Sequence, residues 1–311
     1  MFLNTQALRA HLDSAPESPQ QQLLALPMYR NHRPELSAID HAQLFRRLHA
    51  GWGTEYALRA TLEITDENYL RDATDWTLKQ AYFAIFSTMN AFLYTFGLHS
   101  TNRALTTREV GRMVVKNAYP RPASFYAAGS HGDVTVHRLP LSAYKYLGPG
   151  LGAVEAKAQA EVDGQLRMCR KLKAHAVRAE VQANANTAIR KPDGQLLTHW
   201  KAADWQQITW RLGYTTIFDL LAHLYDGDAS AIFPTLAARS GPRVAAFHHD
   251  LLFIINWLNG VHEAYLAKSV GVLAYSDIVR QLPVHLRDSF VSERFTAWMT
   301  ANSIQESNPP L

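Results

Sequence analysis

The stretch from Ala81 to Gly97 constrains the fold of this chain more than any other segment. Its apolar residues recur at three-to-four spacing, which is the period of an α-helix. Aromatic side chains such as Tyr82, Phe83 and Phe86 widen the apolar face until it covers nearly the whole circumference. A helix that is apolar nearly all round is usually enclosed by other helices. We therefore expect this segment to lie at the centre of a helical bundle.

Most of the remaining chain is predicted to be helical as well. The exception is the region 123–152, where glycines and prolines are frequent and Asp133–Leu139 alternates with the period of two that is typical of a strand. The expected fold is all-α, an up-and-down helical bundle with a small β-hairpin or loop insertion that turns at Gly129–Gly132. We divide the chain into a helical half over 1–122, the insertion over 123–152, a second helical half over 153–303 packed with the first as one unit, and a frayed tail over 304–311.

Two side-chain patterns predict where helices begin. Thr65 or Asp66 is suited to cap the central helix, because its side-chain oxygen can accept hydrogen bonds from the first backbone N–H groups of a helix. Thr106–Glu109 has the pattern of a capping box, with a hydroxyl at the cap and a carboxylate three residues later. This second pattern predicts the start of the next helix along the chain.

Composition limits the class of protein and its surroundings. The single cysteine, Cys169, excludes an internal disulfide framework and fits a reducing compartment. The first residues meet charged side chains too soon for a secretory signal. The most apolar run, Leu251–Ile255, is too short to cross a bilayer. We therefore expect a cytoplasmic protein without a membrane partner.

Basic residues are concentrated in two runs, although the net charge is only +4. The run between 99 and 121 contains one acid, and the run between 167 and 178 contains none. Clustered basic residues favour phosphate binding. The alternative is a pair of solvated helix faces that acids elsewhere in the fold neutralise. The candidate nucleic-acid contacts are Arg103, Arg108, Arg112, Lys116, Arg167, Arg170, Lys171 and Arg178.

The central segment also carries a family resemblance. It reads Ala81-Tyr82-Phe83-Ala84-Ile85-Phe86, followed by Ala91-Phe92-Leu93 and Gly97. This pattern resembles the central helix of HEPN-family domains, which commonly show Ala-Tyr-Tyr-Ala-x-Phe, then Ala-Leu-Leu and a glycine at this spacing. A buried helix built from aromatic and small residues is the alternative. The resemblance implies an up-and-down helical bundle, often dimeric, that acts on RNA, binds nucleotides or supports toxin–antitoxin and phage-defence systems.

The ribonuclease branch of the HEPN family implies an arginine and a histidine separated by four to six residues. In such a site the histidine exchanges protons with the ribose 2′-hydroxyl or the leaving oxygen, and the arginine stabilises phosphate charge. Arg243 with His249 is the best-placed pair, because Arg243 begins a long apolar-striped helix and His249 lies on its polar side. His248 is the substitute, although its position on the apolar stripe also suits a core histidine. The other pairs with this spacing are Arg170–His175 and Arg280–His285.

We expect neither a metal nor a cofactor. His131, Asp133 and His137 have donors close enough to share a divalent cation, but such residues more often form a polar loop. Glycine-rich loops that cradle phosphates are absent from the sequence. Trp205 and Trp210 are expected to pack in the bundle, with stacking on bases as the alternative.

The leading hypothesis is a HEPN-like, RNA-directed protein of a prokaryotic defence or toxin-type system. If it is an enzyme, metal-independent RNA cleavage by Arg243 and His249 is the expected chemistry. The alternative is a non-catalytic helical module that binds a protein partner or nucleic acid through its basic faces. The expected partners are RNA or another nucleic acid, a protein of a defence system, and further copies of the chain in a homo-oligomer.

Overall fold

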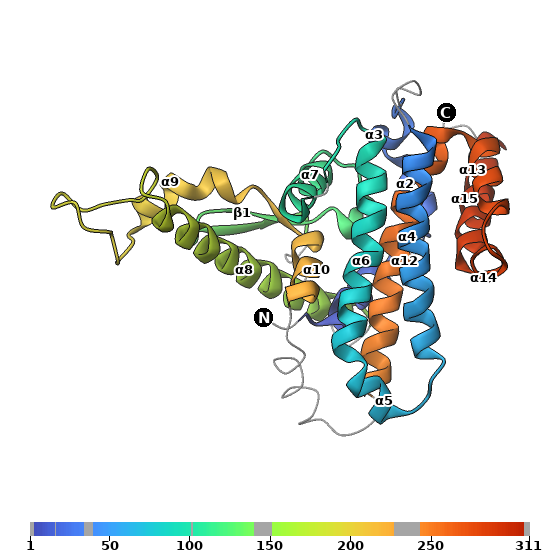
Figure 1. Cartoon of the computed structure of the whole chain (residues 1–311), viewed down its shortest axis with the longest axis horizontal. Coiled ribbons are helices and arrows are strands. Elements are labelled where there is room, and N and C mark those ends of the chain that lie inside the picture. The colour runs from blue at the N-terminus through green and yellow to red at the C-terminus, as the bar shows by residue number, and fades with distance from the viewer. Residues whose placement is uncertain are drawn as a thin grey trace.

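The apolar segment forms α6, Thr74–Tyr94, and this helix lies at the centre of a bundle as expected. The computed structural model describes residues 3–15, 17–33, 40–100, 102–139, 151–226 and 243–307. Around α6 are packed α4 (His41–Leu62), α7 (Arg103–Val115), α10 (Ile217–Asp226) and α12 (Arg243–Val270). Figure 1 shows α4, α6 and α12 standing side by side. Of the aromatic side chains that predicted this position, Phe83 remains 42% exposed and packs edge-on against Tyr225.

A second part of the molecule projects from the bundle as an arm (Figure 1). Its backbone is α8, a helix of 33 residues over Leu151–Ala183, which runs outward beside β1 and α9. The bounds of the remaining helices are α1 Thr5–Leu12, α2 Pro19–Ala25, α3 Pro27–Arg30, α5 Glu67–Asp72, η2 Arg121–Ala123, α9 Ala202–Leu212, α13 Val272–Arg280, α14 Val284–Arg287 and α15 Phe290–Ser307. The fold is therefore mostly α-helical.

The β insertion is a small antiparallel sheet that packs on α8. Strands β1 (Tyr126–Gly129) and β2 (Val134–His137) form the hairpin expected from the sequence, with Gly129 opposite Val134. Gly129 has a φ of +95°, and a Cβ there would lie 1.9 Å from the carbonyl oxygen of Asp133, so the turn requires glycine. A third strand, β3 (Thr215–Thr216), joins the other side of β1 and was not expected. Residues 140–150 of the predicted insertion lie outside the described residues.

Both helix starts predicted from side-chain patterns differ from the structure. Asp66 caps the short helix α5, and α6 begins separately after Ala73. Asn102, and not Thr106, caps α7, because its side chain accepts a hydrogen bond from the backbone N–H of Leu105 at 3.1 Å. Thr106 instead lies one turn inside α7, where its buried hydroxyl donates to Asn90 Oδ1 at 3.1 Å. Tertiary contacts to α6 therefore determine the role of this threonine.

The main hydrophobic core extends from Leu3 to Ala301 and includes residues of both predicted helical halves. The arm has its own smaller core, formed by Ala174, Val181, Trp205, Ile208 and Leu212. Two separate cores joined by the long helix α8 explain how the arm can project from the bundle and still be ordered. Among the helices that the structure describes, none combines the length and the apolar character needed to cross a bilayer.

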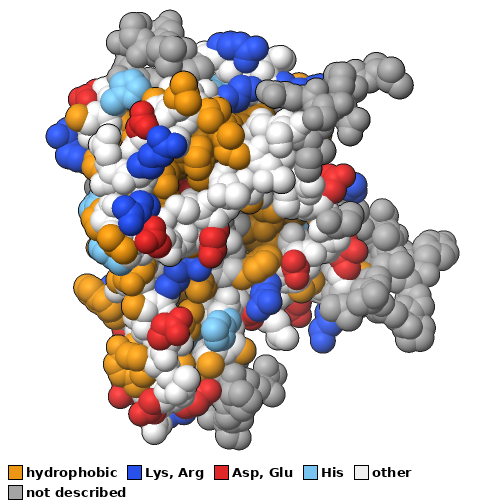
Figure 2. Space-filling model, turned by 90° about the vertical axis from the view of Figure 1, so that its right-hand side faces the viewer, with side chains coloured by type: hydrophobic (Ala, Val, Ile, Leu, Met, Phe, Trp, Pro, Cys, Tyr) orange, Lys and Arg blue, Asp and Glu red, His pale blue; other side chains and the backbone are white. Residues whose placement is uncertain are grey.

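Charged side chains on the outer face of the bundle are mixed in sign. Figure 2 looks onto the side of the molecule that carries α13–α15 and shows Lys and Arg interspersed with Asp and Glu. Between the bundle and the arm, by contrast, basic side chains outnumber acidic ones among the described residues that line the cavity there.

Candidate functional site

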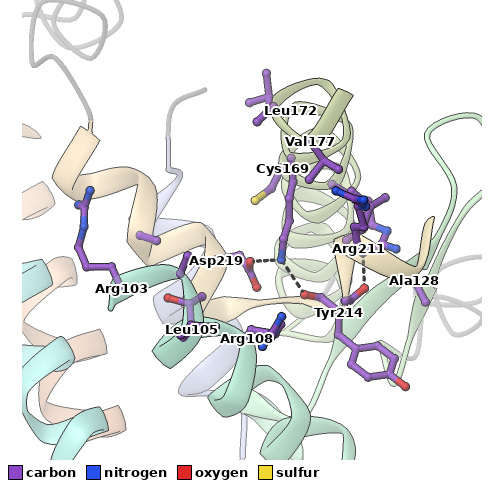
Figure 3. Close-up of a pocket in the computed structure, with 18 of the residues that line it drawn as sticks. Arg103, Leu105, Arg108, Ala128, Cys169, Leu172, Val177, Arg211, Tyr214 and Asp219 are labelled. Carbon is purple, nitrogen blue, oxygen red and sulfur yellow. Dashed lines mark hydrogen bonds and ion pairs between the residues drawn. The ribbon is translucent and has the colours of Figure 1, made fainter. Parts of the chain in front are cut away.

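One candidate site is a cavity of about 1230 Å³ between the bundle and the arm, here called the basic cavity. Figure 3 shows residues of α7 lying across it from residues of α8. The end of α9, the turn that follows it, strand β1 and α10 complete its walls. Among the described residues the lining holds six basic side chains against two acidic ones, Glu180 and Asp219. The six basic residues are Arg103, Arg108, Arg112, Arg170, Lys173 and Arg211.

The α7 wall carries three of these arginines. Arg108 and Arg112 lie one turn apart and share Glu109, which is 2.7 Å from Arg112 and 3.6 Å from Arg108. One carboxylate beside two guanidinium groups leaves this wall with net positive charge. Arg103 lies nearer the bundle, with its guanidinium carbon 3.9 Å from the ring centroid of Tyr225. Both the packing of α7 on α6 and the helical spacing of its arginines therefore direct positive charge toward the cavity.

Arg170 has a structural role in the cavity wall. Its side chain is buried and donates hydrogen bonds to the carbonyl oxygen of Gly129 at 2.9 and 2.6 Å, and to that of Gly213 at 2.8 Å. These bonds join the hairpin to the turn between α9 and β3. Because its donors are used by backbone carbonyls, Arg170 contributes positive charge and shape to the site, and we do not assign it a phosphate contact.

Lys173 is also paired within the protein. Its Nζ lies 2.7 Å from Asp219 Oδ1 and donates to the carbonyl oxygen of Tyr214 at 3.1 Å. Asp219 in turn accepts a hydrogen bond from the backbone N–H of Thr216 at 2.8 Å, at the start of α10. In Figure 3 dashed lines reach Asp219 and Tyr214, the two partners of the Lys173 amine. The ion pair holds α8 against β3 and α10.

The outer face of α9 supplies groups that the sequence analysis did not assign to a site. Trp205, Ile208 and Leu212 face the arm core, so a 3.6-residue period places Trp210 on the opposite side of the helix. Trp210 is 76% exposed, and the expectation that it packs in the bundle was wrong. Arg211 approaches its indole ring at 5.0 Å from the centroid. The helical periodicity of α9 was the feature of the sequence that could have identified both residues as lying off the buried stripe.

The remaining predicted basic residues lie outside the lining that the described residues form. Arg167 pairs with Asp163 at 2.7 Å, and Arg178 packs over Trp200 at 5.2 Å. Lys116, which follows α7, and Lys171 on α8 have exposed side chains. The structure therefore brings Arg103, Arg108, Arg112 and Arg170 of the eight candidates to one cavity and adds Lys173 and Arg211.

A thiol and an imidazole also meet in the cavity wall. Cys169 Sγ lies 3.3 Å from His223 Nε2, and both residues line the cavity. Burial raises the pKa of the Cys169 thiol far above its ordinary range, with the nearby charge of Asp219 as a second cause. A thiol held in its protonated form is a poor nucleophile.

His249 lies in a separate, smaller hollow of about 390 Å³ on α12. Its neighbours there include Arg9 of α1 and Arg59 of α4, which pair with Asp250 and Glu55 at 2.9 Å each. Asn256 lines the same hollow. Arg243, the predicted partner of His249, begins α12, but its side chain lies outside the described residues.

His248 is buried on the other side of α12. Its Nε2 lies 3.1 Å from the carbonyl oxygen of Leu70 and 3.3 Å from the hydroxyl of Thr74. Burial lowers the pKa of His248 to about 4. The side chain is thus a neutral core histidine that joins α12 to α5 and α6.

The donors considered for a metal do not gather around Asp133. His131 instead packs on Trp205, with ring centroids 4.2 Å apart, and its Nε2 lies 3.0 Å from His175 Nε2. Among the residues that the structure describes, no three His, Cys, Asp or Glu side chains are arranged to hold a metal ion. Comparisons with protein-family models, with curated proteins and with solved structures found no match to this chain.

Proposed function

We propose that this chain is an RNA-directed protein that binds a nucleic-acid strand in the basic cavity. The observation that carries the proposal is the meeting of two basic runs, far apart in sequence, at one concave surface. Release of counterions from phosphates makes such a surface favourable for a polyanion. We assign the phosphate contacts to Arg103, Arg108 and Arg112, whose side chains are exposed along α7, and to Arg211 at the end of α9.

The cavity is large enough to hold a segment of a polymer. Sites for small molecules usually enclose roughly 300–1,000 Å³, whereas this cavity measures about 1230 Å³ and has an exposed aromatic side chain in its lining. RNA is the preferred polymer because α6 resembles the central helix of HEPN-family domains, many of which act on RNA. A place in a prokaryotic defence or toxin-type system, and self-association, belong to the same proposal.

The proposal is tested by the affinity and salt dependence of RNA binding. We expect the double variant Arg108→Ala/Arg112→Ala to bind a labelled single-stranded RNA about tenfold or more weakly, and the slope of log K against log[salt] to fall by about 1 to 2. Fluorescence anisotropy over a salt series measures both. The matched control is Lys116→Ala/Arg280→Ala, which removes two exposed basic residues outside the lining of the described residues. An equal loss in both double variants would contradict the proposed site.

A second candidate function, RNA cleavage, is favoured by the hollow around His249. There an exposed imidazole lies with two arginines, which is the combination that proton transfer and phosphate stabilisation require. Incubation of the same RNA with EDTA present, using the natural chain, His249→Ala and the exposed control His199→Ala, tests it. Loss of cleavage in His249→Ala alone supports catalysis there. Salt-sensitive binding without cleavage supports the non-catalytic module.

A further inference from the structure

We propose that Trp210 and Tyr214 form a base-stacking surface at the rim of the basic cavity, so that its ligand is a nucleic acid with unpaired bases. This inference rests on the proposed function, since it concerns the same cavity. It adds a substrate class that the charge of the cavity alone does not specify, because phosphates are present in single and double strands alike.

The exposure of Trp210 is not explained by packing. The buried stripe of α9 is complete without it, because Trp205, Ile208 and Leu212 already fill the arm core. Trp210 is nevertheless a lining residue of the cavity, with 76% of its surface open to solvent. An indole ring in this position is a large apolar face that water solvates poorly. A nucleic-acid base can stack on this indole ring through its flat π-face.

The turn after α9 adds a further aromatic residue, Tyr214, to the lining of the cavity. Gly213 has a φ of +57°, and a Cβ there would lie 3.6 Å from Cγ of Arg108. This turn allows the chain to pass closely over α7, and Tyr214 follows it with 37% of its surface exposed. In Figure 3 the ring of Tyr214 points away from the Lys173–Asp219 ion pair, while its backbone stays in the cavity wall. Its edge-on contact with Tyr126, 5.4 Å between centroids, holds the ring.

Positive charge lies beside the ring of Trp210 and close to the turn that carries Tyr214. Arg211 lies 5.0 Å from the ring centroid of Trp210, and Arg108 lies against the turn that precedes Tyr214. Surfaces that bind single strands combine these two elements, cations along the backbone and rings for the bases. In a duplex the base faces are stacked on one another and cannot reach the rings. The geometry therefore favours a single strand.

The test compares three probes: a single-stranded RNA of 12 nucleotides, the duplex of the same sequence, and inorganic polyphosphate, which has charge but no bases. We expect the natural chain to bind the single strand more tightly than the duplex. Trp210→Ala should weaken binding of the single strand about tenfold and leave polyphosphate binding unchanged, and Trp210→Phe should retain most of the affinity. Trp76→Ala is the matched control, because Trp76 is 64% exposed and lies outside the lining of the described residues.

The outcomes separate this inference from the proposed function. Stacking is overturned if the arginine double variant weakens binding of all three probes but Trp210→Ala changes the binding of none. It is also overturned if the duplex binds as tightly as the single strand. In both cases the cavity remains an anion site. If polyphosphate and RNA binding are both insensitive to the arginine variants, the proposed function fails, and the stacking surface with it. Matching circular dichroism spectra and melting temperatures of the variants show that the fold is intact.

Discussion

At the scale of single residues, several histidines are held in their neutral form by burial. His262 is fully enclosed in the bundle, where its Nε2 lies 2.8 Å from the hydroxyl of Tyr119 and its Nδ1 lies 3.2 Å from that of Thr88. Desolvation, with a smaller effect from Arg294, lowers its pKa to about 3. The ring therefore links α6, α12 and the segment after α7 without carrying a charge.

This burial predicts a loss of stability in mild acid. Below the ordinary imidazole pKa of about 6.5 the unfolded chain takes up a proton at His262, and the folded chain does not do so until about pH 3. The contribution of the neutral, buried imidazole to the free energy of unfolding is thus complete above pH 6.5, and it declines as the pH falls from there toward 3. We expect His262→Gln to reduce the drop in unfolding free energy between pH 6 and pH 5 by about 1 kcal/mol, measured by urea denaturation. The exposed control His199→Gln should show the same drop as the natural chain; an unchanged drop in His262→Gln would contradict this account.

At the scale of elements, the bundle is joined by a buried ionic network between α4, α12 and α15. The guanidinium of Arg294 lies between the carboxylates of Glu55 and Glu263, with its Nη1 2.6 Å from Glu263 Oε1. Trp52 Nε1 donates to the same oxygen at 3.0 Å. Burial raises the pKa of Glu263, and the nearby Arg294 opposes that change. Asn259 completes the shell by donating to Glu55 Oε2 at 2.9 Å.

Removing Arg294 from this network should be costly, although Glu55 keeps its pair with Arg59. Arg294→Ala leaves two buried carboxylates without their shared partner, so we expect a loss of about 3–5 kcal/mol in the free energy of unfolding. Urea denaturation at pH 7 measures it. Arg280→Ala removes an exposed arginine from its 3.4 Å pair with Asp277 and should change stability by less than about 1 kcal/mol. Similar losses in the two variants would show that α15 does not depend on the network.

Elements were predictable from the sequence where one local pattern decided them. The aromatic face of α6 and the alternating strand β2 follow from hydrophobic period, and both were expected. The start of α7 was not predicted correctly, because the side chains of Asn102 and Thr106 are both able to cap a helix. The hydroxyl of Thr106 is used in a hydrogen bond to Asn90, and Asn102 is the cap. Strand β3 has only two residues, and its pairing with β1 is a long-range contact without a local signal.

At the scale of the whole molecule, the candidate site depends on how the arm meets the bundle. The sequence showed two basic runs, but it could not show that they face one another, since that depends on the path of α8 and on the sheet that packs against it. The local charge pattern likewise could not separate Arg170, which bonds to backbone carbonyls, from Arg108, which faces the cavity. Arg211 is isolated from both runs and enters the site only through the end of α9.

We propose that RNA lies between the bundle and the arm, and zero-length ultraviolet crosslinking of the natural chain to RNA tests this placement most directly. The crosslinked peptides are then mapped by mass spectrometry. We expect crosslinks in 103–112 of α7 and in 209–214 at the end of α9. Crosslinks confined to α13–α15, or to the hollow around His249, with none in these two segments, would contradict this placement.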